Sequence, residues 1–215
     1  MSGGVKPMTA FFAGLDLGQA HDSTAVALLA REVECGRACY ALRHLDRWPP
    51  GTPYPRIAED VGRLLRDVPC WACRLVVDQT AVGRAVASLF RQNNAASTRQ
   101  VLISAGHAVT SAGDGCTHVP KKELVSVLQV LLQTQRLKIA AGLPLAEALS
   151  RDMAAFRASV QVAGVNEDVS WREREHDDLV LAVALAAWEG ERNPLGSGKP
   201  LILRDRAWEA LGQGM

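Results

Sequence analysis

Four aspartates lie at the ends of strongly apolar segments, in three separate parts of the chain: Asp16, Asp78 and the adjacent pair Asp177 and Asp178. The apolar segments themselves are Phe11–Gly18, Leu75–Asp78 and Leu179–Trp188, and none of them contains a basic residue. A buried carboxylate is unfavourable unless a cation or hydrogen-bond donors compensate its charge. One divalent cation can compensate several carboxylates together. The pattern therefore predicts a divalent-metal site shared by these aspartates.

Each acid also has a simpler structural interpretation. Asp78 is followed by Gln79 and Thr80, so its side chain could begin a turn. Aspartate directly before a helix is a favoured N-cap, so one residue of the pair 177–178 could cap the helix and the other bind metal. Asp22, in the polar turn after the first apolar segment, is interpreted mainly as a turn cap.

The remaining sequence must position these acids. Alternating and continuous apolar runs predict strands at 11–17, 24–33, 38–48, 74–78 and 100–104. Helical spacing predicts helices at 56–67, 82–92, 121–138, 145–158 and 179–191, with an irregular segment at 105–119 and a hairpin at 159–174.

This order predicts an α/β fold with a five-stranded mixed sheet. Short turns make the first three strands antiparallel, and crossover helices make the later strands parallel. Helices should cover both faces of such a sheet. If the first and fourth strands are neighbours, Asp16 and Asp78 lie about 5 Å apart across the ladder. That separation suits a carboxylate pair that bridges two metal ions about 3.5–4 Å apart.

Composition limits the class of protein. The chain has 215 residues, 48% hydrophobic and 22% charged, with a net charge of +1, which is ordinary for a globular domain. No apolar run is long enough to span a membrane, and five cysteines do not suggest a disulfide framework, so we expect an intracellular protein. The expected organisation is a lead-in at 1–10, one domain at 11–192, and a linker and tail at 193–215.

The acidic sites, in this order and on this strand pattern, resemble the nuclease domain of bacteriophage terminase large subunits, which has a ribonuclease H-like fold. The resemblance spans roughly residues 11–190. The segments that carry it are GLDLGQAHDSTAVALL (14–29), VVDQTAVGRAV (76–86), VPKKELVSVLQVLLQTQRLKI (119–139), LAEALSRDMAAFRA (145–158) and HDDLVLAVALA (176–186).

By resemblance, the activity is a metal-dependent endonuclease that cleaves double-stranded DNA during phage genome packaging. The resemblance implies two Mg²⁺ or Mn²⁺ ions held by Asp16, Asp78, Asp177 and Asp178, with catalytic roles for Asp16, Asp78 and Asp178. Asp178 is preferred to Asp177 as the third ligand. The resemblance places Lys121 near the site or the DNA. Lys122, His176 and Asp22 are further residues expected to bind DNA or to lie beside the site. The chain departs from many relatives at Leu181, where they carry another acid.

The resemblance also implies partners and leaves alternatives. A terminase ATPase domain, a small terminase subunit and a portal are the implied partners, in the cytoplasm of a host cell and without a membrane. The chain is expected to be either the nuclease half of a longer protein or a free-standing relative. Alternatives are a structure-selective nuclease such as a Holliday-junction resolvase, a nucleotide-binding ATPase or kinase with a "GLDLG" strand, and a non-catalytic packaging module.

Overall fold

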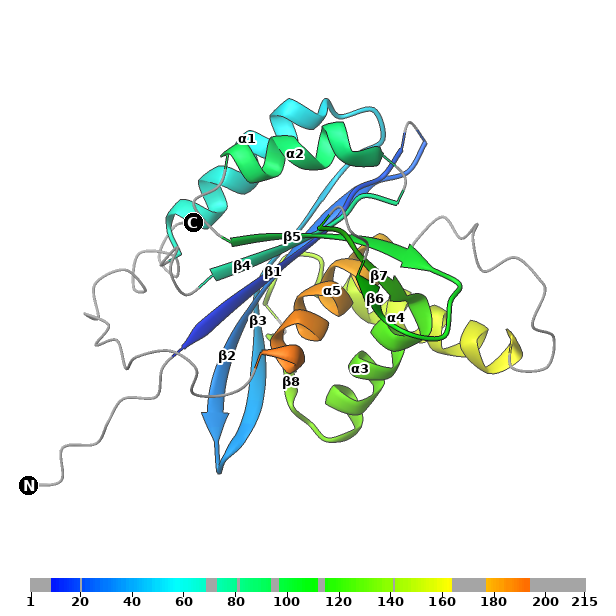
Figure 1. Cartoon of the computed structure of the whole chain (residues 1–215). Helices are drawn as coiled ribbons and strands as arrows, with labels where there is room; N and C mark the ends of the chain where they lie inside the picture. The colour runs from blue at the N-terminus through cyan, green and yellow to red at the C-terminus, as the bar shows by residue number, and fades with distance from the viewer. Residues whose placement is uncertain are drawn as a thin grey trace, which may run out of the picture.

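A computed structural model describes residues 9–19, 21–68, 73–80, 82–93, 97–111, 115–140, 142–163 and 177–193 (Figure 1). The elements, in chain order, are β1 (Ala10–Asp16), β2 (Thr24–Glu34), β3 (Arg37–Trp48), α1 (Tyr54–Arg66), β4 (Cys73–Asp78), α2 (Gly83–Asn93), β5 (Ser97–Ser104), β6 (Thr110–Ser111), β7 (Thr117–Pro120), α3 (Lys121–Gln133), β8 (Leu137–Ile139), α4 (Ala146–Ala163) and α5 (Asp178–Arg192). The predicted lead-in and tail lie almost wholly outside the described residues.

One mixed sheet organises the described elements, with strand order β6-β7-β5-β4-β1-β2-β3-β8. The strands β1, β2 and β3 form the predicted antiparallel meander, and β4 lies parallel to β1. The five predicted strands are therefore present at the centre of the sheet. Three short strands that the sequence analysis did not predict extend it to eight strands.

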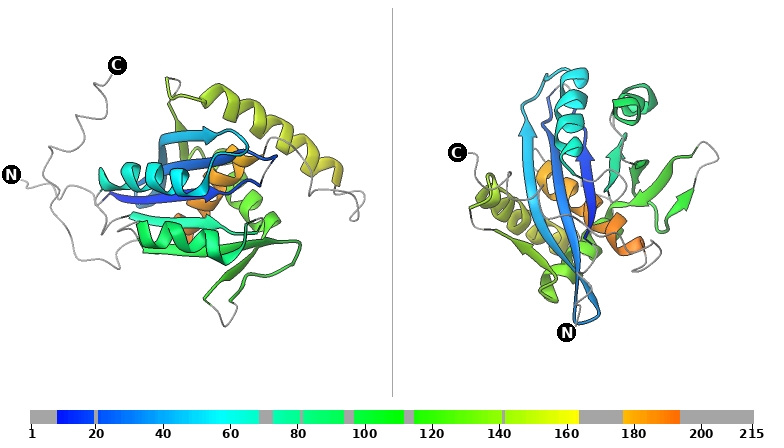
Figure 2. Two further views of the ribbon diagram at one scale, coloured as in Figure 1. Left: turned by 90° about the horizontal axis from the view of Figure 1, so that it is seen from above. Right: turned by 90° about the vertical axis from the view of Figure 1, so that its left-hand side faces the viewer.

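Helices cover both faces of the sheet, which explains why the central strands are apolar on both sides. In the views of Figure 2, α1 and α2 lie on one face, whereas α3, α4 and α5 lie on the other. Along β1, Phe11, Ala13 and Leu15 pack toward α1 and α2, while Phe12 packs toward α5. By this alternation, Asp16 at the end of β1 belongs to the α5 face. None of the described helices is long and apolar enough to cross a membrane.

Three predictions of local structure are wrong. The helix predicted at 121–138 ends at Gln133, because Gln135 adopts a positive φ of 55° and the following residues form β8 beside β3. The segment predicted as irregular, 105–119, contains β6 and β7. The hairpin predicted from residue 159 does not begin there, since α4 continues to Ala163, and the rest of it lies outside the described residues.

The helix α5 packs against β1 at unusually close range. A Cβ atom added to Gly14 would lie 2.1 Å from the carbonyl oxygen of Ala182 and 2.7 Å from the amide nitrogen of Ala186. Only glycine permits this contact, because any side chain would overlap the helix backbone. Every residue of α5 from Asp178 to Gly190 is buried, as its nearly continuous apolar sequence predicts.

We expect Gly14→Ala to lower the free energy of unfolding by about 1–3 kcal/mol, the usual effect of forcing extra atoms into a packed core. Chemical denaturation followed by circular dichroism measures this. Gly142→Ala is the matched control, because a Cβ added at Gly142 meets no atom within 4 Å. The control should stay within about 0.5 kcal/mol of the parent protein. Equal stability of the two variants would contradict the close packing.

Candidate metal-binding site

The strand register places Asp16 and Asp78 side by side. Parallel strands β1 and β4 pair Asp16 with Asp78 directly, at the carboxyl end of both strands. Val76, two residues before Asp78, packs in the α5-side core, so both carboxylates belong to that face of the sheet. Neighbouring strands lie about 4.8 Å apart. The predicted adjacency of these two acids is therefore present in the fold.

The environment of Asp16 disfavours a negative charge. Burial raises the pKa of Asp16 well above its ordinary value, and the nearby charges of Asp78, Asp177 and Asp178 raise it further. Lys121 opposes this increase. The four aspartates thus lie close enough to influence one another, and we call Asp16, Asp78, Asp177 and Asp178 the acidic cluster.

Asp78 is 6% exposed, and burial raises its pKa as well. Its Oδ1 accepts hydrogen bonds from the amide N–H of Thr80, at 2.9 Å, and from the Thr80 hydroxyl. These donors lower the pKa of Asp78 and so oppose the effect of burial. The turn interpretation of Asp78 is therefore correct for Oδ1, the carboxylate oxygen that accepts both hydrogen bonds from Thr80.

Asp177 immediately precedes α5, at the N-cap position, but its side chain makes no capping hydrogen bond. Instead its Oδ2 lies 2.5 Å from the Nζ of Lys121, the first residue of α3. The side chains of this pair are 19% and 22% exposed, so solvent reaches both. The predicted closeness of Lys121 to the acids is thus explained by an ion pair with Asp177.

Asp178 has a different counterion. Arg47, near the end of β3, donates from Nε to Asp178 Oδ2 at 2.7 Å and from Nη2 to Asp178 Oδ1 at 2.8 Å. The same Nη2 also donates to Asp152 of α4, at 2.9 Å. Arg47 therefore joins β3, α4 and the first turn of α5. Sequence reasoning missed both Arg47 and Asp152, because no local pattern signals a contact between residues more than 100 positions apart.

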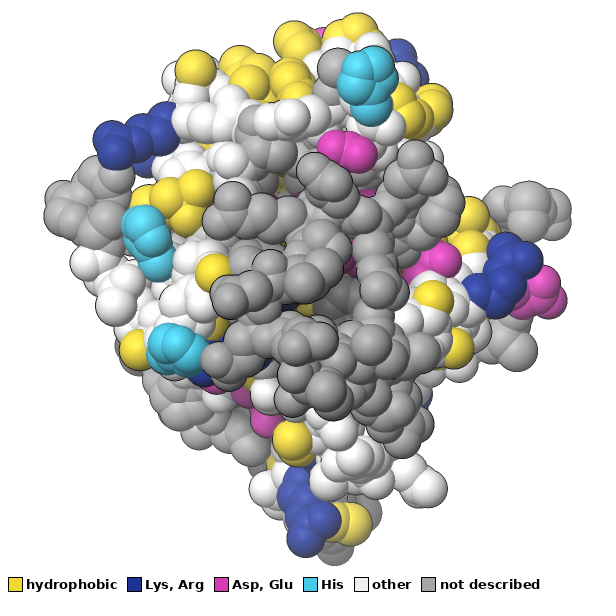
Figure 3. Space-filling model, turned by 90° about the vertical axis from the view of Figure 1, so that its right-hand side faces the viewer, with side chains coloured by type: hydrophobic (Ala, Val, Ile, Leu, Met, Phe, Trp, Pro, Cys, Tyr) yellow, Lys and Arg dark blue, Asp and Glu magenta, His cyan; other side chains and the backbone are white. Residues whose placement is uncertain are grey.

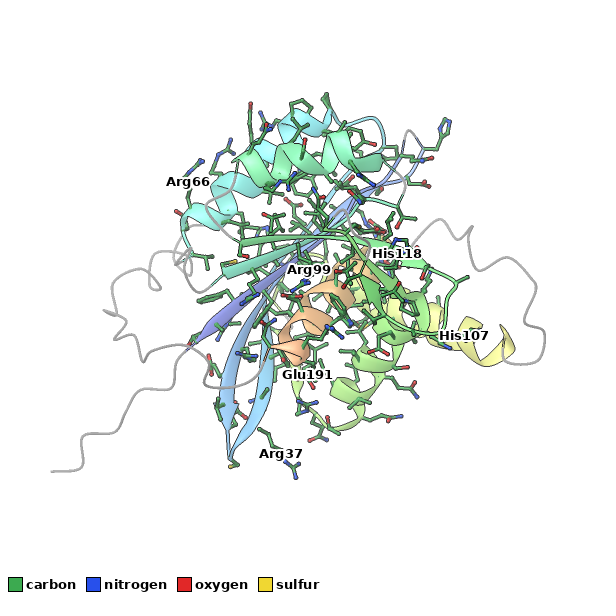
Figure 4. The ribbon with its side chains drawn as sticks, in the orientation of Figure 1. Arg37, Arg66, Arg99, His107, His118 and Glu191 are labelled. Atoms are coloured by element: carbon green, nitrogen blue, oxygen red, sulfur yellow. The ribbon has the colours of Figure 1, made fainter. Side chains whose placement is uncertain are left out.

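The other predicted residues lie outside the acidic cluster. Lys122 Nζ lies 2.6 Å from Nδ1 of His107, an exposed contact on the side of the sheet where β6 and β7 lie (Figure 4). Asp22 is exposed on the turn after β1, where its amide donates to the Gln19 carbonyl at 3.0 Å. His176 lies outside the described residues.

The donor set is made of carboxylate oxygens, which suits a hard divalent cation. Within the described ranges, no group of three or more His, Cys, Asp or Glu side chains is arranged so that it could hold a metal ion. Lys121 and Arg47 engage Asp177 and Asp178 in ion pairs. Figure 3 shows the side of the molecule on the right of Figure 1, where acidic, basic and histidine side chains are interspersed without a continuous basic patch among the coloured residues.

No model of a known protein family matches the sequence, and no curated protein sequence matches it. Solved structures do share its fold. The large terminase nuclease from thermophilic phage G20c is 19% identical, with a TM-score of 0.51 over 83% of this chain and 81% of that chain. The human cytomegalovirus terminase nuclease domain, Mn soaked and inhibitor bound, is 16% identical, with a TM-score of 0.56 over 86% and 85%. The P22 large terminase nuclease domain is 13% identical, with a TM-score of 0.50 over 87% and 84%.

These comparisons and the sheet topology define the class of fold. The mixed sheet, flanked by helices and carrying acids at the carboxyl ends of β1 and β4, is a ribonuclease H-like α/β fold. Within that class, the chain has the fold of large terminase nuclease domains. The fold predicted from the sequence is therefore confirmed.

We expect Asp16→Asn to raise the melting temperature of the metal-free protein at pH 7. The folded state raises the pKa of Asp16, so ionised Asp16 opposes folding above that pKa. The gain should shrink as the pH falls through the folded-state pKa toward the unfolded value near 4, since protonation removes the charge from the parent protein. Melting curves in chelator across this pH range measure the effect.

Asp67→Asn, at an exposed carboxyl just after α1, serves as the control and should give no comparable gain. A gain from Asp16→Asn that stays constant with pH would show that the charge of Asp16 is not its cause.

Proposed function

We propose that this protein is a metal-dependent endonuclease that hydrolyses DNA phosphodiester bonds during phage genome packaging. Because a fold supports many functions, the proposal rests on the site rather than on the fold alone. The observation that carries it is the pair of half-buried Asp16 and buried Asp78, side by side at the carboxyl ends of parallel strands, with raised pKa values. Like charges held together with perturbed pKa values are typical of functional sites.

The likeness of fold to terminase nucleases supports the choice of substrate and metal. A human cytomegalovirus domain with this fold was soaked with Mn, and we propose Mn²⁺ or Mg²⁺ for this chain. Two such ions, when bound, would activate a water molecule for attack on phosphorus and stabilise the departing oxygen. Double-stranded DNA is the proposed substrate, and contacts to its phosphates would make cleavage nearly independent of sequence.

We propose Asp16, Asp78 and Asp177 as the metal ligands. Sequence analysis preferred Asp178 to Asp177, but both oxygens of Asp178 accept hydrogen bonds from Arg47. Asp177 faces a single ammonium group, which can move away on a flexible side chain more easily than a bidentate guanidinium. Of the two acids, Asp177 also has the larger effect on the pKa of Asp16.

Partners follow from the same proposal. A terminase ATPase domain, a small terminase subunit and a portal would act with this nuclease in the cytoplasm of the host cell. Lys121, which pairs with Asp177, and Lys122, the next residue of α3, would contact the DNA backbone. Comparing a four-way junction with a linear duplex as substrates would separate this function from a junction resolvase.

We expect the purified protein to nick and linearise plasmid DNA in Mn²⁺ or Mg²⁺, and a chelator to abolish the reaction. Asp16→Asn should reduce the rate by more than about 100-fold, because even residues that only support metal ligands are worth about 10–100-fold. Gel electrophoresis of plasmid over time measures both. Equal cleavage by the parent protein and Asp16→Asn would identify the activity as a contaminant.

The two adjacent aspartates should behave differently. Asp177→Asn should weaken Mn²⁺ binding, measured by calorimetry, while its melting temperature in chelator stays near that of the parent. Burial raises the pKa of Asp178 as well, but Arg47 opposes this increase. Asp178→Asn should instead lower the melting temperature, because the loss of two charged hydrogen bonds leaves Arg47 with an incomplete set of carboxylate partners, and this outweighs the relief of a buried charge. The opposite result, with metal affinity lost only in Asp178→Asn, would assign the third ligand to Asp178.

A further inference from the structure

We propose that Thr80 is a positioning residue for Asp78: its hydroxyl fixes one carboxylate oxygen and thereby directs the other toward the metal-binding site. This inference rests on the proposed function, since it assigns a role toward the same metal. It concerns a residue that the sequence pattern marked only as part of a turn.

Two donors of Thr80 converge on one oxygen. The amide N–H and the side-chain hydroxyl of Thr80 both donate to Oδ1 of Asp78. A carboxylate held by two donors on the same oxygen cannot rotate freely about its terminal torsion. Asp78, a residue that is 6% exposed, therefore presents Oδ2 in a fixed direction.

A third group fixes the hydroxyl itself. The amide of Ile103, on β5, donates to Thr80 Oγ1 at 2.7 Å. One residue earlier, the amide of Gln79 donates to the carbonyl of Val101 on the same strand, at 3.0 Å. The Thr80 side chain thus continues the pairing of β4 with β5 just beyond the point where β4 ends.

The direction of the hydroxyl proton follows from this arrangement. Because Thr80 Oγ1 accepts the Ile103 amide, its own proton is free to be donated to Asp78. Donors in such a chain polarise one another, so the bond to the carboxylate is strengthened. The chain from Ile103 through Thr80 to Asp78 links β5 to a proposed metal ligand on β4.

A turn alone does not require the hydroxyl. The amide of Thr80 would still donate to Asp78 Oδ1 if the side chain were apolar. Thr80→Val keeps the shape and the turn but removes the hydroxyl, whereas Thr80→Ser keeps the hydroxyl. Thr80→Ala removes the same hydroxyl without adding a methyl group, and it provides a second test if the valine variant folds poorly.

The experiment is a Mn²⁺ titration of each variant by calorimetry, together with melting curves in chelator. We expect Thr80→Val and Thr80→Ala to bind Mn²⁺ about tenfold or more weakly, as for other residues that orient metal ligands. Thr80→Ser should bind within about threefold of the parent, because its hydroxyl can make the same bonds. Melting temperatures in chelator should change little, since Thr80 is exposed and water can replace the lost bond to Ile103.

Thr134→Val is the matched control. Thr134, just after the end of α3, donates its hydroxyl to the Val130 carbonyl and is exposed. The length of α3 separates it from Lys121 by roughly 20 Å, so its Mn²⁺ affinity should equal that of the parent.

Parent-like Mn²⁺ affinity in both Thr80→Val and Thr80→Ala would overturn the positioning role while leaving the nuclease proposal intact. Loss of affinity in Thr80→Ser as large as in Thr80→Val would also overturn it. If the parent protein itself binds no Mn²⁺, the proposed function fails first, and this inference fails with it.

Discussion

The contact between β1 and α5 at Gly14 is the constraint on which the candidate site depends. Only a glycine lets the helix backbone lie directly on the strand. From Gly14, two strand residues advance about 7 Å to Asp16. From Ala182, four helical residues run back about 6 Å to Asp178. The distance from Gly14 to Asp16 along β1 thus matches the distance from Ala182 to Asp178 along α5. The contact between Gly14 and Ala182 therefore brings the start of α5 to the carboxyl end of β1.

This geometry gathers more negative charge than the described cations neutralise. At the start of α5, Arg47 pairs with Asp178 and Lys121 pairs with Asp177. Burial is the largest cause of the raised pKa of Asp16, Asp78 and Asp178. Asp177 and Asp178 thus have close ion pairs, whereas Lys121 acts on Asp16 and Asp78 through its charge. A divalent cation would neutralise the remaining charge of Asp16 and Asp78. For this reason the site is more informative about function than the fold.

Sequence reasoning could predict the elements that carry local patterns. The apolar runs around Asp16 and Asp78 predicted strands, their order predicted the mixed sheet, and the apolar segment after Asp178 predicted a buried helix. It could not predict β8, because three residues that follow a long helical pattern carry no signal of their own. The role of Arg47 could not be predicted either, since it depends on β3, α4 and α5 meeting at one point. Local patterns specify elements, whereas the partners of a charge depend on how distant elements pack.

The same distinction explains why the sequence could not show which of Asp177 and Asp178 is the better candidate metal ligand. Adjacent residues at the start of a helix point about 100° apart, so one can face the strand acids while the other faces a different element. In this fold, Asp178 faces Arg47 of β3, and Asp177 faces Lys121 of α3. Arg47 also holds Asp152, so it ties the first turn of α5 to both the sheet and α4. The bidentate pair of Arg47 and Asp178 then holds the start of α5 in place. Under the proposed function, Asp177, whose side chain is 22% exposed, would exchange the ammonium group of Lys121 for a metal ion.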